Sequence, residues 1–146
     1  MRLLYLITCC YLGMTLSVMA SEATSLCAAG LMKSHYHSTV EKALEVCNGI
    51  NDVPQAVCMA GALQSRKILY FFPDLKSKCS KVESIAAAHC IEGALKSNHL
   101  VYTIDEAIKT CGGLQSIPQG YCISGALQNS KILYTIPSAI KACEGI

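Results

Sequence analysis

The sequence predicts an all-α fold built from four tandem helix-turn-helix repeats of about 32 residues. Eight cysteines alternate at intervals of 11 and 21 residues, and only the first interval, at 20, departs from this pattern. A glycine also follows the first cysteine of each unit by three residues, at Gly30, Gly61, Gly93 and Gly125. Apolar residues recur at helical spacing, with no strand-like alternation. Each unit is therefore expected to be a disulfide-stapled hairpin. The units would stack as a short solenoid or, alternatively, fold into a compact helical bundle.

Residues 1–20 have the features of a secretory signal peptide. Arg2 provides the positive start, the stretch 3–18 is mostly apolar, and cleavage is expected between Ala20 and Ser21. Cleavage would remove Cys9 and Cys10 and leave an even set of eight cysteines. A lipoprotein signal ending at Cys9 and an uncleaved anchor are the alternatives, but the first has a very short apolar region and the second is a weak span.

The remainder, residues 21–146, is expected to be one all-α domain whose repeats cover approximately 21–52, 53–83, 84–116 and 117–146. Losing Arg2 lowers the formal net charge from +2 to +1, which gives no reason to expect a nucleic-acid partner. No second apolar run is long enough to span a bilayer. Many evenly placed cysteines in a small exported chain indicate a disulfide framework. We therefore expect a secreted protein, extracellular or periplasmic, that does not span a membrane once it is mature.

Each unit contains signals for two helices. The first helix is expected to start near Asp52, Ser84 or Ser116 in units two to four and to run to the hydrophobic triplets 68–70, 100–102 and 132–134. The second is expected to start at a capping box, Ser38–Glu41 in unit one and Thr103–Glu106 in unit three, and to end before a C-capping glycine (Gly49, Gly112 and Gly145). Three tyrosines at the hairpin bends are expected to pack there with their hydroxyls in water (Tyr70, Tyr102 and Tyr134).

The cysteines can be paired in two regular ways. Pairing across units would leave Cys27 and Cys143 at opposite ends of the array, whereas pairing within units uses all eight and joins neighbouring helix ends. We therefore expect the disulfides Cys27–Cys47, Cys58–Cys79, Cys90–Cys111 and Cys122–Cys143. Each would close a loop of about 20 residues, a constraint worth roughly 3 kcal/mol. The repeated glycines are expected to serve close helix packing, because a mid-helix glycine otherwise costs about 1 kcal/mol relative to alanine.

The sequence gives no catalytic, cofactor or metal site. The cysteine spacings differ from the short spacings of zinc sites, and the histidines in His35-Tyr36-His37 would diverge on a helix. His89 and Cys90 are adjacent in sequence, so they would not face each other on a helix, and we expect Cys90 to be oxidised. The sequence therefore favours a protein that is not an enzyme, and enzymatic activity is the least favoured reading.

Polar residues recur at two positions that stacked repeats would align into rows. They form a candidate binding face of seven side chains (Lys33, Gln64, Lys67, Lys96, His99, Gln128 and Lys131). Repeat proteins often bind partners along such rows, although a solvated helix face would have the same composition. We therefore expect a protein- or peptide-binding module, such as an effector, inhibitor or adaptor. The alternative is a small carrier with a lipid or amphiphile in an apolar cavity, suggested by the 52% hydrophobic composition.

Overall fold

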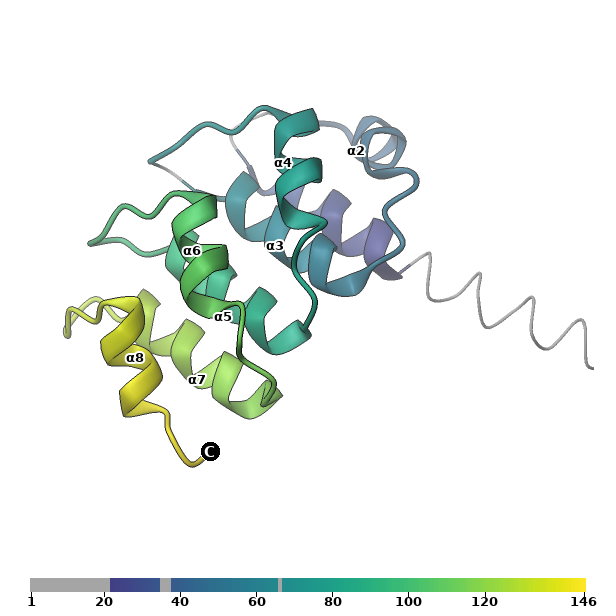
Figure 1. The fold of residues 1–146 in the computed structure, drawn as a ribbon. Coiled ribbons are helices and arrows are strands. Elements are labelled where there is room, and N and C mark those ends of the chain that lie inside the picture. The colour runs from purple at the N-terminus through teal and green to yellow at the C-terminus, as the bar shows by residue number, and fades with distance from the viewer. Residues whose placement is uncertain (1–21, 35–37, 66) are drawn as a thin grey trace, which may run out of the picture.

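The computed structural model describes residues 22–34, 38–65 and 67–146, and these ranges are helical with connecting loops (Figure 1). The expected signal peptide, residues 1–20, lies outside them. The first helix covers 22–32. The others are α2 (Val40–Cys47), α3 (Val53–Leu63), α4 (Phe72–Cys79), α5 (Ile85–Leu95), α6 (Ile104–Cys111), α7 (Ile117–Gln128) and α8 (Ile136–Ala142). The all-α prediction is confirmed. None of the described helices is long and apolar enough to cross a membrane.

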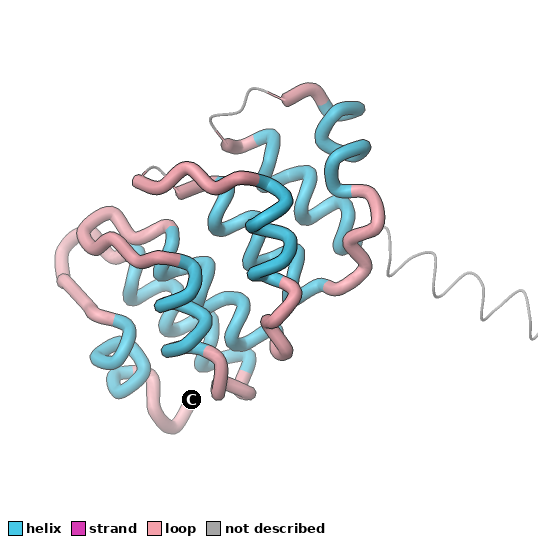
Figure 2. Tube along the Cα trace, turned by 45° about the horizontal axis from the view of Figure 1, so that its top comes forward, coloured by secondary structure: helices cyan, strands magenta, loops and turns pink. Residues whose placement is uncertain are grey.

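The helices form two layers that follow chain order. The first helices of units two to four lie side by side, with α5 packed between α3 and α7 (Figures 1 and 2). The second helices cover them, so that α4 packs on α3, α6 on α5 and α8 on α7. The layer of first helices thus repeats one contact from unit to unit, an arrangement that fits a helical repeat or a bundle of repeated hairpins.

Local sequence signals determine where the helices begin. Asp52, Ser84 and Ser116 cap the first helices of units two to four by accepting hydrogen bonds from backbone N–H groups three residues later. The Thr103–Glu106 capping box is present, with both reciprocal hydrogen bonds. The expected box at Ser38–Glu41 is wrong by one residue, because Thr39 is the N-cap and accepts from Lys42 N–H at 3.3 Å.

The first helices end earlier than expected, at Leu63, Leu95 and Gln128, and the hydrophobic triplets that follow are loops. In unit three, the Ser97 hydroxyl accepts hydrogen bonds from the N–H groups of His99 and Leu100 at 3.4 and 3.3 Å. Such a serine turn offers the backbone partners outside the helix, which favours termination.

The glycines that follow the second helices differ in backbone conformation. Gly49 and Gly145 have φ of 80° and 86°, the left-handed conformation of a C-capping glycine. Gly112 is the C-cap residue of α6, as expected, but it keeps a helical φ of −61°.

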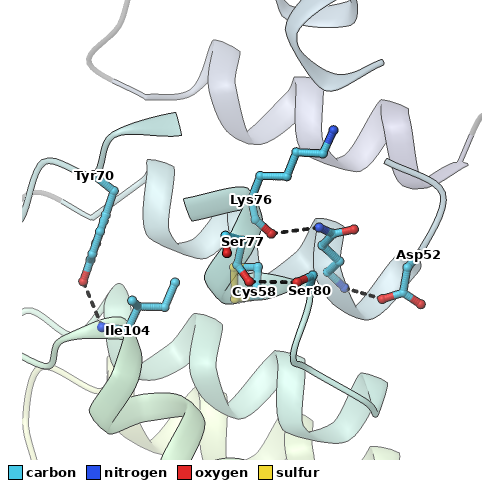
Figure 3. The surroundings of a disulfide bond; sticks show 9 residues. Asp52, Cys58, Tyr70, Lys76, Ser77, Ser80 and Ile104 are labelled. Atoms are coloured by element: carbon cyan, nitrogen blue, oxygen red, sulfur yellow. Dashed lines mark hydrogen bonds between the residues drawn. A yellow bond between two sulfur atoms is a disulfide. The ribbon is translucent and has the colours of Figure 1, made fainter. Parts of the chain in front are cut away.

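Four disulfides join the two helices of each unit, and their cysteines are those of the within-unit scheme. Cys27–Cys47, Cys58–Cys79, Cys90–Cys111 and Cys122–Cys143 have Cα–Cα distances of 5.7 to 6.0 Å. Around Cys58, side-chain hydrogen bonds add to the link, since the Gln55 amide donates to the Lys76 carbonyl at 3.0 Å (Figure 3). A framework of this density is typical of an oxidising, extracellular-type environment.

Three of the four repeated glycines lie where the first helices of successive units approach most closely. A Cβ atom on Gly30 or Gly93 would lie 2.5 Å from the Cα atom of Ala60 or Ser124, and one on Gly61 would lie 2.7 Å from the Cα atom of Glu92. No side chain larger than hydrogen fits at those distances. The packing explanation is therefore confirmed for these three, whereas a Cβ on Gly125 would meet none of the described residues beyond its own stretch of helix within 4 Å.

The bend tyrosines connect neighbouring units, which differs from the sequence-based expectation. The Tyr70 hydroxyl accepts a hydrogen bond from Ile104 N–H at 3.1 Å, and the Tyr102 hydroxyl accepts from Ile136 N–H at 3.2 Å (Figure 3 shows the first). Each hydroxyl thereby satisfies a free donor in the first turn of the next unit's second helix. The expectation that the hydroxyls face water is wrong for these two residues.

Candidate binding groove

A polar groove runs across the ends of the first helices. It has a volume of about 530 Å³ and draws residues from all four units. Its lining consists of Lys33, Gln64, Lys67, Lys96, Ser97, Asn98 and Gln128. The groove therefore follows the direction in which the units stack.

Five of the seven residues expected on the binding face line this groove. The two others, His99 and Lys131, are exposed residues of the hairpin loops and are not part of its lining. Sequence reasoning missed Ser97 and Asn98. Both lie in the chain between Lys96 and His99, which the sequence placed on the binding face. That position is the sequence signal that could have identified them as groove residues.

The repeat positions these side chains through the ends of the first helices. Gln64 and Lys96 are the C-cap residues of α3 and α5, and Gln128 is the last residue of α7. Lys33 directly follows the helix over 22–32 and donates its backbone N–H to the Ala29 carbonyl at 3.1 Å. Because the helices stack side by side, equivalent end residues fall into one row.

A small charge cluster borders the groove at unit three. The Glu92 carboxylate lies 3.2 Å from Lys96 Nζ and 3.2 Å from His89 Nδ1, and its side chain is one-fifth exposed. Burial alone would raise the pKa of Glu92, but the hydrogen bond from His89 and the charge of Lys96 outweigh it and hold that pKa below 4.5. The positive charge of Lys96 is therefore largely compensated within the protein.

Lys33 and Lys67 differ from Lys96 in this respect. Neither ammonium group is within 4 Å of a carboxylate of the described residues, and both side chains are exposed. Lys67 Nζ donates a hydrogen bond of 3.4 Å to the Leu100 carbonyl in the next unit. The groove thus offers two uncompensated cations and several amide groups, a combination suited to carboxylates and peptide backbone.

The other sequence signals do not form a catalytic arrangement. Cys90 is bonded to Cys111, while His89 contacts Glu92 and stacks on Tyr121 with ring centroids 4.0 Å apart. Within the described ranges, no group of three or more His, Cys, Asp or Glu side chains is placed to hold a metal ion. The pair His35 and His37 lies outside those ranges.

A second pocket, largely apolar, lies between the first two units. Its volume is about 340 Å³, and its lining residues are Leu31, Ser38, Lys42, Val46, Leu63, Tyr70, Phe71, Phe72 and Pro73. Phe71 is 81% exposed, which is unusual for a phenylalanine unless something covers it. This pocket has the character of a site for an apolar group.

The polar groove and the apolar pocket differ in the ligand chemistry they suit. No family model, curated protein or solved structure was found to match this chain.

Proposed function

We propose that this chain is a secreted, non-catalytic module that binds an extended acidic segment of a protein or peptide along the polar groove. The observation that carries the proposal is the alignment of polar residues from all four units, including Lys33 and Lys67, in one groove. Repeated helix ends suit an extended ligand because each unit contributes an equivalent contact.

Charge favours an acidic ligand over a neutral or basic one. Lys33 and Lys67 have no carboxylate partner among the described residues, whereas Glu92 neutralises Lys96 at the groove's border. Two exposed ion pairs, each worth up to about 1 kcal/mol, would change affinity by roughly tenfold. The interaction should weaken as salt concentration rises, because exposed charges are screened.

A binding experiment with matched charge variants tests the proposal. The probe is a fluorescent oligo-glutamate peptide, and an oligo-lysine peptide of equal length is the control. We expect saturable binding of the acidic peptide, weakened roughly tenfold in K33Q/K67Q. The double variant K109Q/K141Q alters net charge equally but leaves the groove intact, since Lys109 and Lys141 are exposed on α6 and α8. Equal loss in both variants, or no saturable binding, would contradict the proposal.

A second candidate function, carrying a small amphiphile, has support from the apolar pocket between units one and two. Its volume of about 340 Å³ is within the range of small-molecule sites, and Phe71 gives it an exposed aromatic edge. A carrier should arrive loaded. Solvent extraction of the purified protein followed by mass spectrometry would show a bound lipid, and F71S should reduce its amount while K33Q/K67Q should not.

A further inference from the structure

The two ends of the array expose opposite halves of the contact that joins its units. Inside the array, this contact is made three times between first helices, at Gly30 with Ala60, Gly61 with Glu92 and Gly93 with Ser124. The fourth glycine, Gly125, has the same position in its unit and none of the described residues near it. The last unit therefore presents an open docking surface. In each of the first three units, the first helix of the next unit covers the equivalent surface.

Apolar residues around Gly125 are exposed where their counterparts are covered. Tyr121 is 58% exposed, although its counterpart Val57 is 7% exposed. Ile146 is 59% exposed, whereas its counterparts Val82 and Leu114 are buried. For His89, the unit-three counterpart of Tyr121, the next unit supplies the cover, because the His89 ring packs on Tyr121. We call Ile117, Tyr121, Gly125, Tyr134 and Ile146 the tail face.

The first unit shows the complementary pattern. Met32 is 41% exposed, while its counterparts in the next units, Leu63, Leu95 and Leu127, are buried. Val40 is 52% exposed, whereas at the same position Phe72 is partly buried and Ile104 and Ile136 are buried, the last two in hydrogen-bond contact with a tyrosine of the preceding unit. We call Leu26, Ala29, Met32, Val40 and Leu44 the head face.

We propose that copies of this chain associate head to tail, with the tail face of one copy docking on the head face of another. The contact between first helices of successive units indicates that the partner is a second copy of the chain. Within one chain, that contact joins surfaces equivalent to the tail face and the head face. Ala29 is as small as Ala60, which already packs against Gly30, so Gly125 can approach it equally closely. Stacks of repeats with apolar end faces need either polar caps or a further unit.

The internal contacts predict the intermolecular ones. Tyr121 should contact Leu26 of the second copy, since His89 and Tyr121 pair at that position inside the array. The Tyr134 hydroxyl should accept from the Val40 N–H of the second copy, as Tyr70 and Tyr102 accept from Ile104 and Ile136. The interface is heterologous, so it can continue from copy to copy. The polar groove would then continue from Gln128 to Lys33 of the next copy, although the proposal does not rest on peptide binding.

Sedimentation velocity of the full secreted chain over a range of concentrations tests this association. We expect species larger than a dimer as concentration rises. G125R should block the tail face and M32R the head face, raising the dissociation constant by at least about 30-fold. Because both positions are exposed in a single copy, both variants should fold, which near-UV circular dichroism checks. L133R, at an exposed residue outside both faces, is the matched control and should associate like the parent protein.

Mixing the two variants distinguishes head-to-tail docking from other modes. G125R keeps a head face and M32R keeps a tail face, so an equimolar mixture should form a dimer and nothing larger. A parent protein that is monomeric at every concentration would overturn the proposal. It would also be overturned if the mixture stayed monomeric, or if M32R alone still dimerised, as a symmetric tail-to-tail contact would predict.

Discussion

The hydroxyl of Tyr102 accepts a hydrogen bond from the backbone N–H of Ile136 at 3.2 Å, and this bond joins the third unit to the fourth. Tyr70 makes the equivalent bond one unit earlier. A side chain at one hairpin bend thus stabilises the start of the next unit's second helix.

Removing that hydroxyl should destabilise the protein measurably. We expect Y102F to lower the free energy of unfolding by about 1 kcal/mol, because the Ile136 donor loses its partner. Y134F should change it by less than about 0.5 kcal/mol, since none of the described residues donates a hydrogen bond to the Tyr134 hydroxyl, unlike those of Tyr70 and Tyr102. Urea unfolding at low protein concentration measures both. Equal losses would contradict the role assigned to Tyr102.

A methyl group at the repeated glycine should have opposite effects inside and at the end of the array. G93A places a Cβ atom 2.5 Å from the Cα atom of Ser124, so we expect a loss of roughly 1–3 kcal/mol from overpacking. G125A meets none of the described residues and should gain up to about 1 kcal/mol from helix propensity. Thermal unfolding of the two variants would show the difference. A stabilised G93A would rule out the close contact.

The disulfides should be local to each unit and individually important. Replacing both Cys90 and Cys111 by alanine opens one loop with a sequence separation of 21 residues, and we expect a loss of about 3 kcal/mol. A peptide map under non-reducing conditions should recover these two cysteines on linked peptides. Recovery of Cys90 linked to Cys79 instead would show that the bridges cross between units.

Stability should fall in acid partly through Glu92. The pKa of Glu92 is lowered in the folded protein from its ordinary value of 4.5. Its contribution to the free energy of unfolding is therefore fully present above pH 4.5 and is lost as the pH falls through the lower pKa of the folded state. The group is partly exposed, which limits the effect to roughly 1 kcal/mol. Urea unfolding from neutral pH into the acid range should show this loss, and E92Q should flatten that part of the profile. An unchanged profile in E92Q would assign the acid sensitivity to other groups.

Much of the fold could be predicted from local pattern. The phase of the cysteines against helix starts, together with N-caps such as Ser84, indicated paired helices and a disulfide within each unit. Helix ends were harder to place, because the apolar residues after Leu63 continue a helical pattern that the chain does not follow. One of those residues, Tyr70, is held by the next unit through its hydrogen bond with Ile104, and a single-unit pattern does not contain that partner.

The groove, too, could be predicted from the sequence only in part. Repetition alone placed Lys33, Gln64, Lys67, Lys96 and Gln128 in aligned rows, because equal positions in stacked units must align. Only the tertiary structure decided that these residues share one groove and that His99 and Lys131 lie outside its lining. The sequence by itself thus determined the repeat unit, its helices and the small residue at the helix contact. The sequence did not determine which of the equivalent residues are covered and which remain exposed. That depends on neighbours distant in the chain, which come into contact only when the units stack in the folded protein.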